Sequence, residues 1–214
     1  MNITCVLYNQ MTALDLVGPY QVLSMVPGVN VRLAAVTAGP QQTDNGMRIL
    51  ADCALSELRD SELILVPGTG RPNVPLSDAQ LIAWLREHGP RARWLTSVCT
   101  GSLLLGAAGL LRGKRATTHW LALAGLREFG AEPAEERVVV DGSLITAAGV
   151  SAGIDMALAL VGRVWGRELA ETIQLGIEYD PAPPFASGSP RTAAAGIVSA
   201  ATEALTRHMS AQQL

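Results

Sequence analysis

The chain is poor in charged and aromatic residues, and this scarcity argues against several classes of protein. Charged residues make up 16% of the 214 positions and aromatic residues 4%, while hydrophobic residues reach 49%. The 16 basic residues form no run or stripe and the net charge is −3, so we expect neither a nucleic acid nor a membrane surface as partner. Apolar stretches are interrupted well before the roughly 20 residues that a membrane span requires.

Cysteine is also scarce, with three widely spaced residues and no C-x-x-C pair. Such a set provides neither a disulfide framework nor a metal site of that type. We expect Cys5 and Cys53 to be packing residues. The N-terminus has no basic segment followed by an apolar one and resembles a first core strand. These features together predict a protein of the reducing cytoplasm.

Short apolar runs alternate with helix-length segments, a pattern typical of a mostly parallel sheet with helices on both faces. We therefore expect one doubly wound α/β domain over residues 1–214. The expected strands are 3–8, 31–36, 63–66, 94–98, 137–140 and 144–147. The expected helices are 19–25, 77–88, 100–111, 120–129, 151–164 and 167–175. Asp141-Gly142 is a hairpin signal, so the last two strands should be antiparallel.

Proline and small residues dominate the segment after Tyr179, which reads Asp-Pro-Ala-Pro-Pro-Phe-Ala-Ser-Gly-Ser-Pro. This composition cannot continue a helix, so we expect an extended arm from about residue 180, followed by an alanine-rich helix to about 208. The arm and helix either fold back over the domain or reach a neighbour, and a homodimer is the simplest expectation. We expect no helix-turn-helix module after residue 180.

Cys99 has the most informative setting in the chain. The apolar run from Trp94 ends there, and a helix of small residues begins immediately. A cysteine at such a strand-to-helix elbow is lifted off the sheet edge toward solvent or ligand, near the amide N–H groups of the helix. Those groups favour thiolate over thiol. The pattern predicts a nucleophile, and the alternative is a small buried cysteine that fills a tight turn.

Asp15 follows the first predicted strand, whose carboxyl end lies near Cys99 if the sheet is doubly wound. We expect it just ahead of a helix that Gly18 and Pro19 begin. One interpretation is an acid that faces Cys99. The other is a carboxylate that the helix dipole stabilises.

A glycine-rich loop, Pro-Gly-Thr-Gly, follows the strand that ends at Val66. Beside a nucleophilic sulfur, the N–H groups of Gly68 and Thr69, with that of Thr100, would bind a developing negative charge. The loop therefore predicts an oxyanion hole, although two glycines between a strand and a helix are a weak signal alone.

Two further residues are candidates for the same site. Val150 lies in a strand–glycine–helix segment whose small residues indicate close helix packing, and it would border the pocket. His119 is the histidine with the most informative setting. It would pair with Cys99 only within hydrogen-bond reach, and the alternative is a hydrogen-bonded histidine at a strand end.

Five segments carry a resemblance to a known family: Asp-Leu-Val-Gly-Pro-Tyr-Gln-Val-Leu from Asp15, Leu-Val-Pro-Gly from Leu65, Ser-Val-Cys-Thr-Gly-Ser from Ser97, Arg-Ala-Thr-Thr-His-Trp from Arg115 and Ala-Gly-Val-Ser-Ala-Gly-Ile-Asp from Ala148. Together they resemble the ThiJ/PfpI superfamily. Within it the chain is most similar to the isocyanide hydratases, including the arm from Tyr179. The similarity covers nearly the whole chain.

The resemblance implies a flavodoxin-like fold of the class I glutamine-amidotransferase type. It also implies a homodimeric, cofactor-free enzyme that adds water to a small-molecule isonitrile and gives an N-substituted formamide. Cys99 would attack the isonitrile carbon and form a thioimidate, Asp15 would hydrogen-bond the sulfur and handle protons, and Thr100 would assist. The residues expected to bind substrate are Gly68, Thr69, Val150 and His119, with no metal.

The chain departs from its relatives at two points. Peptidases of the superfamily have a histidine directly after the nucleophile, whereas this chain has Thr100, so a peptidase would lack its base. The loop also has Pro-Gly-Thr-Gly where Pro-Gly-Gly is more usual. In addition, a carboxylate beside a thiolate raises the thiol pKa. We therefore expect Asp15 to be neutral when Cys99 is a thiolate.

Two other functions would use the same elbow. One is a redox or ligand sensor whose cysteine becomes sulfenic or sulfinic acid. The other is a glyoxalase-like enzyme, which would differ in the residues that shape the pocket. Turnover of an organic isonitrile distinguishes the hydratase from both.

Overall fold

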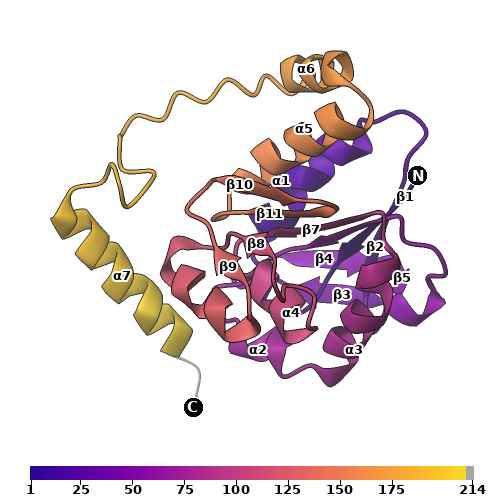
Figure 1. Ribbon diagram of the computed structural model, residues 1–214, viewed down its shortest axis with the longest axis horizontal. Helices are drawn as coiled ribbons and strands as arrows, with labels where there is room; N and C mark the ends of the chain where they lie inside the picture. The colour runs from indigo at the N-terminus through magenta and orange to yellow at the C-terminus, as the bar shows by residue number, and fades with distance from the viewer. Residues whose placement is uncertain (211–214) are drawn as a thin grey trace.

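A seven-stranded sheet forms the centre of the protein, and a computed structural model describes it within residues 1–210 (Figure 1). The strand order is β10-β11-β7-β6-β1-β2-β5, and every neighbouring pair is parallel except β10 and β11. The strands are β1 Asn2–Val6, β2 Asn30–Ala35, β5 Cys53–Ala54, β6 Leu63–Val66, β7 Trp94–Val98, β10 Val138–Asp141 and β11 Leu144–Ala147.

The chain builds this sheet outward in two directions from β1. It first adds β2 and β5 on one side, then crosses to β6 and continues through β7 and β11 on the other. This confirms the doubly wound, mostly parallel fold and places the switch point between β1 and β6. The antiparallel β10–β11 pair also confirms the predicted hairpin, in which Gly142 has a φ of +64°.

Helices cover both faces of the sheet. On one face α1 packs against α5, and α6 packs on the outer side of α5; α3 and α4 lie together on the other face (Figure 1). Two small sheets and short 3₁₀ helices complete the fold, and the bounds of all helices and small sheets follow. The helices are α1 Ala13–Ser24, α2 Asn73–Leu76, α3 Ala79–His88, α4 Gly101–Ala107, α5 Ala152–Val164, α6 Arg167–Gly176 and α7 Ala195–Ser210. The 3₁₀ helices are η1 Leu55–Glu57, η2 Gly89–Arg91 and η3 Trp120–Phe129, and the small sheets pair β3 Gly39–Gln42 with β4 Arg48–Ala51 and β8 Arg115–Ala116 with β9 Glu132–Pro133.

The largest error in the expected elements concerns α1, which begins at Ala13 rather than at Pro19. Pro19 lies inside the helix, where its missing N–H leaves the carbonyl of Asp15 without the usual helical donor. Proline and the preceding glycine therefore do not mark the start here, because the buried face of the helix extends six residues further back. The expected helix over 120–129 is also 3₁₀ rather than α.

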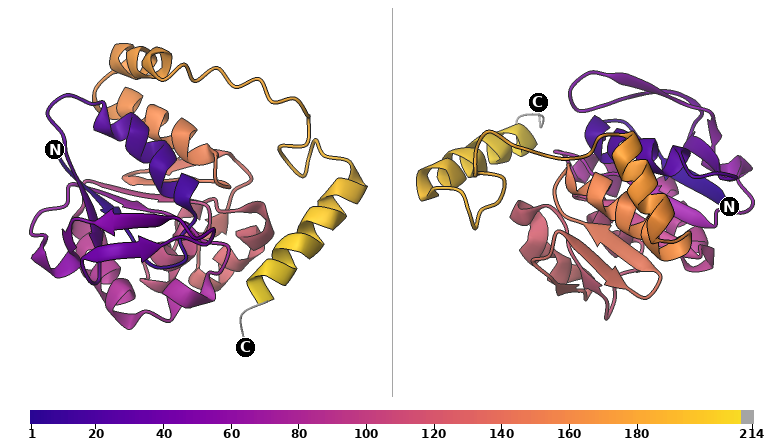
Figure 2. Two further views of the ribbon diagram at one scale, coloured as in Figure 1. Left: turned by 180° about the vertical axis from the view of Figure 1, so that it is seen from behind. Right: turned by 90° about the horizontal axis from the view of Figure 1, so that it is seen from above.

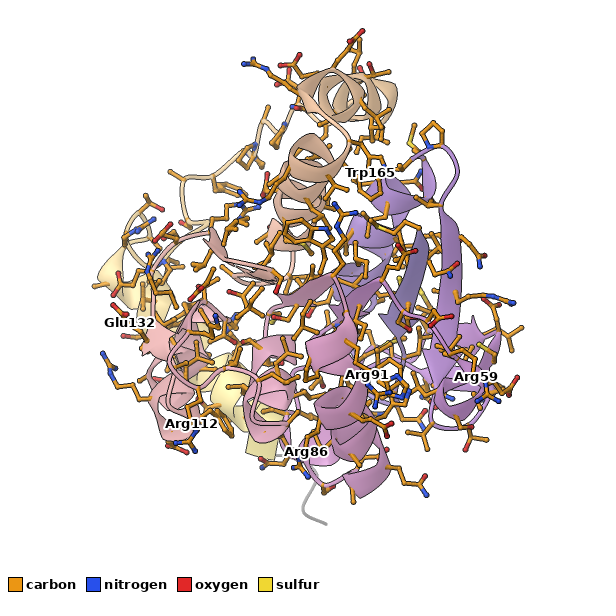
Figure 3. All side chains as sticks on the ribbon, turned by 45° about the vertical axis from the view of Figure 1, so that its right-hand side comes forward. Arg59, Arg86, Arg91, Arg112, Glu132 and Trp165 are labelled. Atoms are coloured by element: carbon orange, nitrogen blue, oxygen red, sulfur yellow. The ribbon has the colours of Figure 1, made fainter. Side chains whose placement is uncertain are left out.

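The arm and α7 extend away from the body, as the two views of Figure 2 show. Most residues from 180 to 207 are exposed, and the exposed fraction reaches 78% for Phe185 and 53% for Ile197. Residues 180–194 form neither a helix nor a strand, and α7 follows them. The charged surface elsewhere is dispersed: Arg59, Arg86, Arg91 and Arg112 lie apart on the face shown in Figure 3. None of the helices described within residues 1–210 is long and apolar enough to cross a membrane.

Candidate active site

Four loops meet at one edge of the sheet, because each follows the carboxyl end of a parallel strand near the switch point. Residues 7–12 follow β1, residues 67–72 follow β6, residues 99–100 follow β7 and residues 148–151 follow β11. Register places the ends of β6, β7 and β11 side by side, with Val66 opposite Ser97 and Val98 opposite Ala147. The topology thus brings the candidate residues of four separate segments together.

Cys99 occupies a strained elbow between β7 and α4, with a φ of 55°. Its N–H donates to the carbonyl oxygens of Ala147 at 3.1 Å and Ala148 at 2.9 Å, which fixes the elbow to the neighbouring strand. Gly101 makes the turn sterically possible, since a Cβ there would lie 2.2 Å from the carbonyl oxygen of Val66. The expected elbow is therefore present, but the cysteine is 5% exposed and faces a buried carboxyl rather than open solvent.

Asp15 supplies that carboxyl from the first turn of α1, inside the helix rather than ahead of it. Its side chain is fully buried, and Oδ2 accepts a hydrogen bond of 2.9 Å from the Gly68 N–H. Oδ1 receives no N–H or O–H group from the part of the chain that the structure describes. Burial raises the pKa of Asp15 to about 7, although the hydrogen bonds from Gly68 and the Cys99 thiol act in the opposite direction.

The environment of Cys99 favours the thiol. Burial raises its pKa first, and the nearby charge of Asp15 raises it further. The backbone N–H groups of Val150 and Thr100 hydrogen-bond the sulfur and lower the pKa, but they do not offset these two effects. The amides act in the expected direction, but burial and the charge of Asp15 outweigh them. When Asp15 and Cys99 together lose one proton, the negative charge lies on Asp15. A Cys99 thiolate therefore forms only when the thiol proton moves to another group.

The glycine-rich loop does not present the expected oxyanion hole, because its amides are already bonded. Gly68 N–H donates to Asp15, and Thr69 N–H donates to Thr100 Oγ1 at 2.8 Å. Thr100 Oγ1 in turn donates to the carbonyl oxygen of Thr69 at 2.7 Å. The loop instead fixes the carboxyl and the residue after the cysteine. The N–H groups that face the sulfur belong to Thr100 and Val150.

His119 lies on the other side of the 148–151 turn. Its ring meets the backbone of Gly149, where a Cβ would come within 2.9 Å of His119 Cδ2. Its Nδ1 accepts a long hydrogen bond of 3.4 Å from Leu121 N–H, and burial lowers its pKa. No hydrogen bond joins its imidazole to Cys99 in the described structure. The neighbouring Thr118 contacts the elbow instead, donating from Oγ1 to the Cys99 carbonyl at 2.9 Å.

Tyr8 and Thr118 belong to the site and were missed in the sequence. Tyr8 Oη donates to the Pro67 carbonyl at 2.6 Å, and its pKa is raised by burial and by the charges of Asp15 and Cys99. A tyrosine at the end of the first core strand and a threonine pair ahead of His119 were the available signals. Among the described residues, no group of three or more His, Cys, Asp or Glu side chains could hold a metal ion.

The comparisons with known proteins assign the chain to a family. The DJ-1/PfpI family model matches residues 1–163, so the chain belongs to the DJ-1/PfpI family. It is 43% identical over 198 residues to an isonitrile hydratase of Pseudomonas putida. The matched region covers 92% of this chain and 87% of that protein. A transcriptional regulator of the helix-turn-helix type from Pseudomonas aeruginosa is 37% identical over 134 residues, which is 62% of this chain and 40% of the regulator.

Solved structures agree with this assignment. A ThiJ/PfpI family protein from Pseudomonas syringae superposes with a TM-score of 0.94 at 39% identity, over 98% of this chain and 87% of that one. DJ-1beta of Drosophila melanogaster has a TM-score of 0.74 at 20% identity, over 83% of this chain and 97% of that one, and it shares the fold.

Proposed function

We propose that the protein is an isonitrile hydratase, a hydro-lyase that adds water to an isonitrile and releases an N-substituted formamide. The observation that carries the proposal is the buried pair of Cys99 and Asp15, with one nucleophile and one carboxyl whose pKa of about 7 suits proton transfer near neutral pH. Identity of 43% to an isonitrile hydratase over 92% of the chain supports this reaction among those that the fold could host.

The reaction begins with the proton that the pair shares. As sulfur attacks the terminal isonitrile carbon, the S–H bond breaks, the proton passes to Asp15, and a C–S bond forms. Asp15 then delivers the proton to the same carbon, which gives a thioimidate, R–N=CH–S–Cys99. This sequence reconciles the raised thiol pKa with nucleophilic attack, because the thiolate exists only while the carboxyl holds its proton.

Water completes the addition. Its oxygen bonds to the thioimidate carbon, one of its protons goes to nitrogen, and the second returns through Asp15 to sulfur as the C–S bond breaks. The product is R–NH–CHO, and the thiol is restored. The N–H groups of Thr100 and Val150 stabilise negative charge on sulfur at both steps. Gly68 and Thr69 act indirectly, by holding Asp15 and Thr100. Val150 borders the bound substrate, and His119 supports this border through its contact with Gly149.

A redox or ligand sensor is less well supported. A sensing cysteine is typically an accessible thiol of low pKa, whereas Cys99 is 5% exposed and its pKa is raised by burial. A thiol of this kind is suited to activation by a bound substrate.

We also propose a cytoplasmic homodimer. Three free cysteines are compatible with a reducing compartment. The exposed Phe185 and Ile197 in the arm and α7 suit burial against a second copy. In sedimentation equilibrium we expect the full-length protein to have the mass of a dimer. Removal of residues 180–214 should leave a monomer. A monomeric full-length protein would contradict the proposal.

The test of the function is formamide production from an aryl isonitrile, followed by ultraviolet absorbance. Wild-type protein should turn over the substrate, Cys99→Ala should show no turnover above background, and Cys53→Ala should retain wild-type turnover because Cys53 lies in β5, away from the elbow. Absence of turnover by folded, reduced wild type would overturn the proposal. Equal turnover by Cys99→Ala would reject the nucleophile.

A further inference from the structure

Arg137 holds the turn beside Cys99 at both of its ends. It lies just ahead of β10, which packs beside α5 (Figure 1). Its backbone carbonyl accepts a hydrogen bond of 2.9 Å from the Ala148 N–H. Its guanidinium donates from Nη2 to Ser151 Oγ at 3.2 Å and from Nε to the carboxylate of Asp155. One residue therefore brackets the turn formed by residues 148–151.

Val150, inside this turn, has a backbone conformation that its surroundings must fix. Val150 has a φ of +27°, a backbone conformation that a β-branched residue rarely adopts. Strain of this kind persists only where the surrounding structure fixes it, and it gathers at functional sites. The N–H of Val150 is one of the two amides that hydrogen-bond the Cys99 sulfur. A small rotation of the turn would carry that N–H away from the sulfur.

We propose that Arg137 is a positioning residue for Cys99: its guanidinium, by holding Ser151 and Asp155, keeps the Val150 N–H directed at the sulfur while negative charge develops there. The inference rests on the proposed function in one respect, that Cys99 is the nucleophile. Arg137 itself touches neither the sulfur nor the carboxyl of Asp15 through any interaction described above.

A second contact extends the same cluster. Tyr179 Oη donates to Asp155 Oδ1 at 3.1 Å, so the residue at the start of the arm shares the carboxylate that Arg137 binds. The side chains of Arg137 and Asp155 are 50% and 32% exposed. Half-exposed ion pairs contribute little to global stability. Loss of Arg137 should thus act on the reactivity of Cys99 far more than on folding.

The remaining groups that face Cys99 stay in place when Arg137 is changed. Asp15 from α1 is the charged group that acts on the sulfur, and the phenol of Tyr8, in the loop that follows β1, also interacts with it. Neither of these two side chains contacts Arg137. A shift in the titration of Cys99 in an Arg137 variant is therefore attributable to the turn.

The experiment is alkylation of Cys99 by iodoacetamide as a function of pH, with the modified peptide quantified by mass spectrometry in the full-length protein. Arg137→Ala should move the profile to higher pH and lower the rate at a fixed pH by about three- to tenfold, since a tenfold lower thiolate fraction corresponds to one pKa unit. Arg137→Lys, which keeps a donor for Asp155, should lie between the two. Thermal unfolding should change little.

Arg115→Ala is the matched control. Arg115 forms an ion pair with Glu136, the residue next to Arg137, and its side chain is 48% exposed, but it does not bond the turn. Its alkylation profile should coincide with that of wild type. An unchanged profile for Arg137→Ala, or an equal shift for Arg115→Ala, would overturn the inference.

Alkylation needs no isonitrile, so the two proposals fail separately. A hydratase assay without product leaves a shifted alkylation profile standing. Conversely, isonitrile turnover together with an alkylation profile that Arg137→Ala leaves unchanged would overturn the positioning role and leave the hydratase standing.

Discussion

The two sides of Cys99 are held in opposite ways. On the inner wall, which we define as Asp15, Gly68, Thr69 and Thr100, all four residues are buried, and the hydrogen bonds that join them to one another run from 2.7 to 2.9 Å. On the outer wall, the turn of residues 148–151, a strained amide depends on a half-exposed arginine. The difference indicates that the carboxyl proposed to move the proton is fixed by the core, whereas the amide proposed to stabilise the sulfur is fixed from the surface.

Gly101→Ala should have the largest effect, because the elbow supports both walls. The added Cβ would lie 2.2 Å from the Val66 carbonyl oxygen and 2.8 Å from that of Pro67, and backbone atoms cannot move aside cheaply. We expect the free energy of unfolding to fall by about 3 kcal/mol or more. Gly125→Ala, with no atom within 4 Å of the new Cβ, is the control. Equal stability of the two variants in urea denaturation would contradict the elbow geometry.

Asp15→Asn should be the most damaging conservative change to catalysis on the inner wall. The amide oxygen can still accept the Gly68 N–H, but the side chain can no longer carry a proton between sulfur and carbon. We expect kcat to fall by about 10² to 10⁴, the usual range for a lost acid or base, with the circular dichroism spectrum unchanged. Turnover close to wild type would remove Asp15 from the proton transfer.

The same variant tests the buried charge. Because the pKa of Asp15 is raised from 3.8 to about 7 in the folded protein, the stability linked to its neutral form is complete below pH 3.8 and is lost as pH rises through 7. Asp15→Asn lacks this pH-dependent contribution to stability, because its amide does not titrate. Its free energy of unfolding relative to wild type should therefore increase between pH 4 and 7, by at most about 1.4 kcal/mol per unit, and level off above. A difference that does not vary with pH would show that the carboxyl is not shifted.

Thr100→Val should have a smaller effect on stability. It keeps the shape of the side chain but removes both hydrogen bonds with Thr69 and leaves a buried N–H and C=O without that partner. We expect a loss of about 2 kcal/mol in the free energy of unfolding. Thr172→Val is the control, since its hydroxyl bonds only the Glu168 carbonyl on the exposed face of α6. If the free energy of unfolding fell equally in the two variants, the buried hydrogen bonds of the inner wall would contribute no more than an exposed one.

Tyr179→Phe should have the smallest effect, because it removes one part-buried hydrogen bond to Asp155, which Arg137 binds behind the outer wall. We expect less than about 1 kcal/mol in unfolding free energy. A loss as large as that of Thr100→Val would show that both walls are held with similar strength, and the comparison between them would fail.

The sequence was sufficient to predict the fold and the elbow, because both depend on short-range patterns. Strands 63–66, 94–98 and 144–147 have the expected bounds, since each is an apolar run between clear boundaries. The start of α1 was wrong because burial of residues such as Asp15 and Leu16 outweighs the local signal of Pro19.

The hydrogen bonding of the site could not be predicted in the same way. The partners of the Gly68 and Thr69 amides come from 53 and 31 residues away in the chain. The role of Arg137 depends on side chains 14 and 18 residues further along. No local pattern marks such pairs, and only the packing of loops at one sheet edge brings them together.

The left-handed backbone at Cys99 places the proposed nucleophile in a conformation that costs stability. A residue other than glycine at a φ of 55° carries strain of about 1 kcal/mol, and glycine would release it. A chain selected for heat resistance alone should therefore exchange this cysteine for glycine early. Its retention in such a selection would require that turnover be selected at the same time.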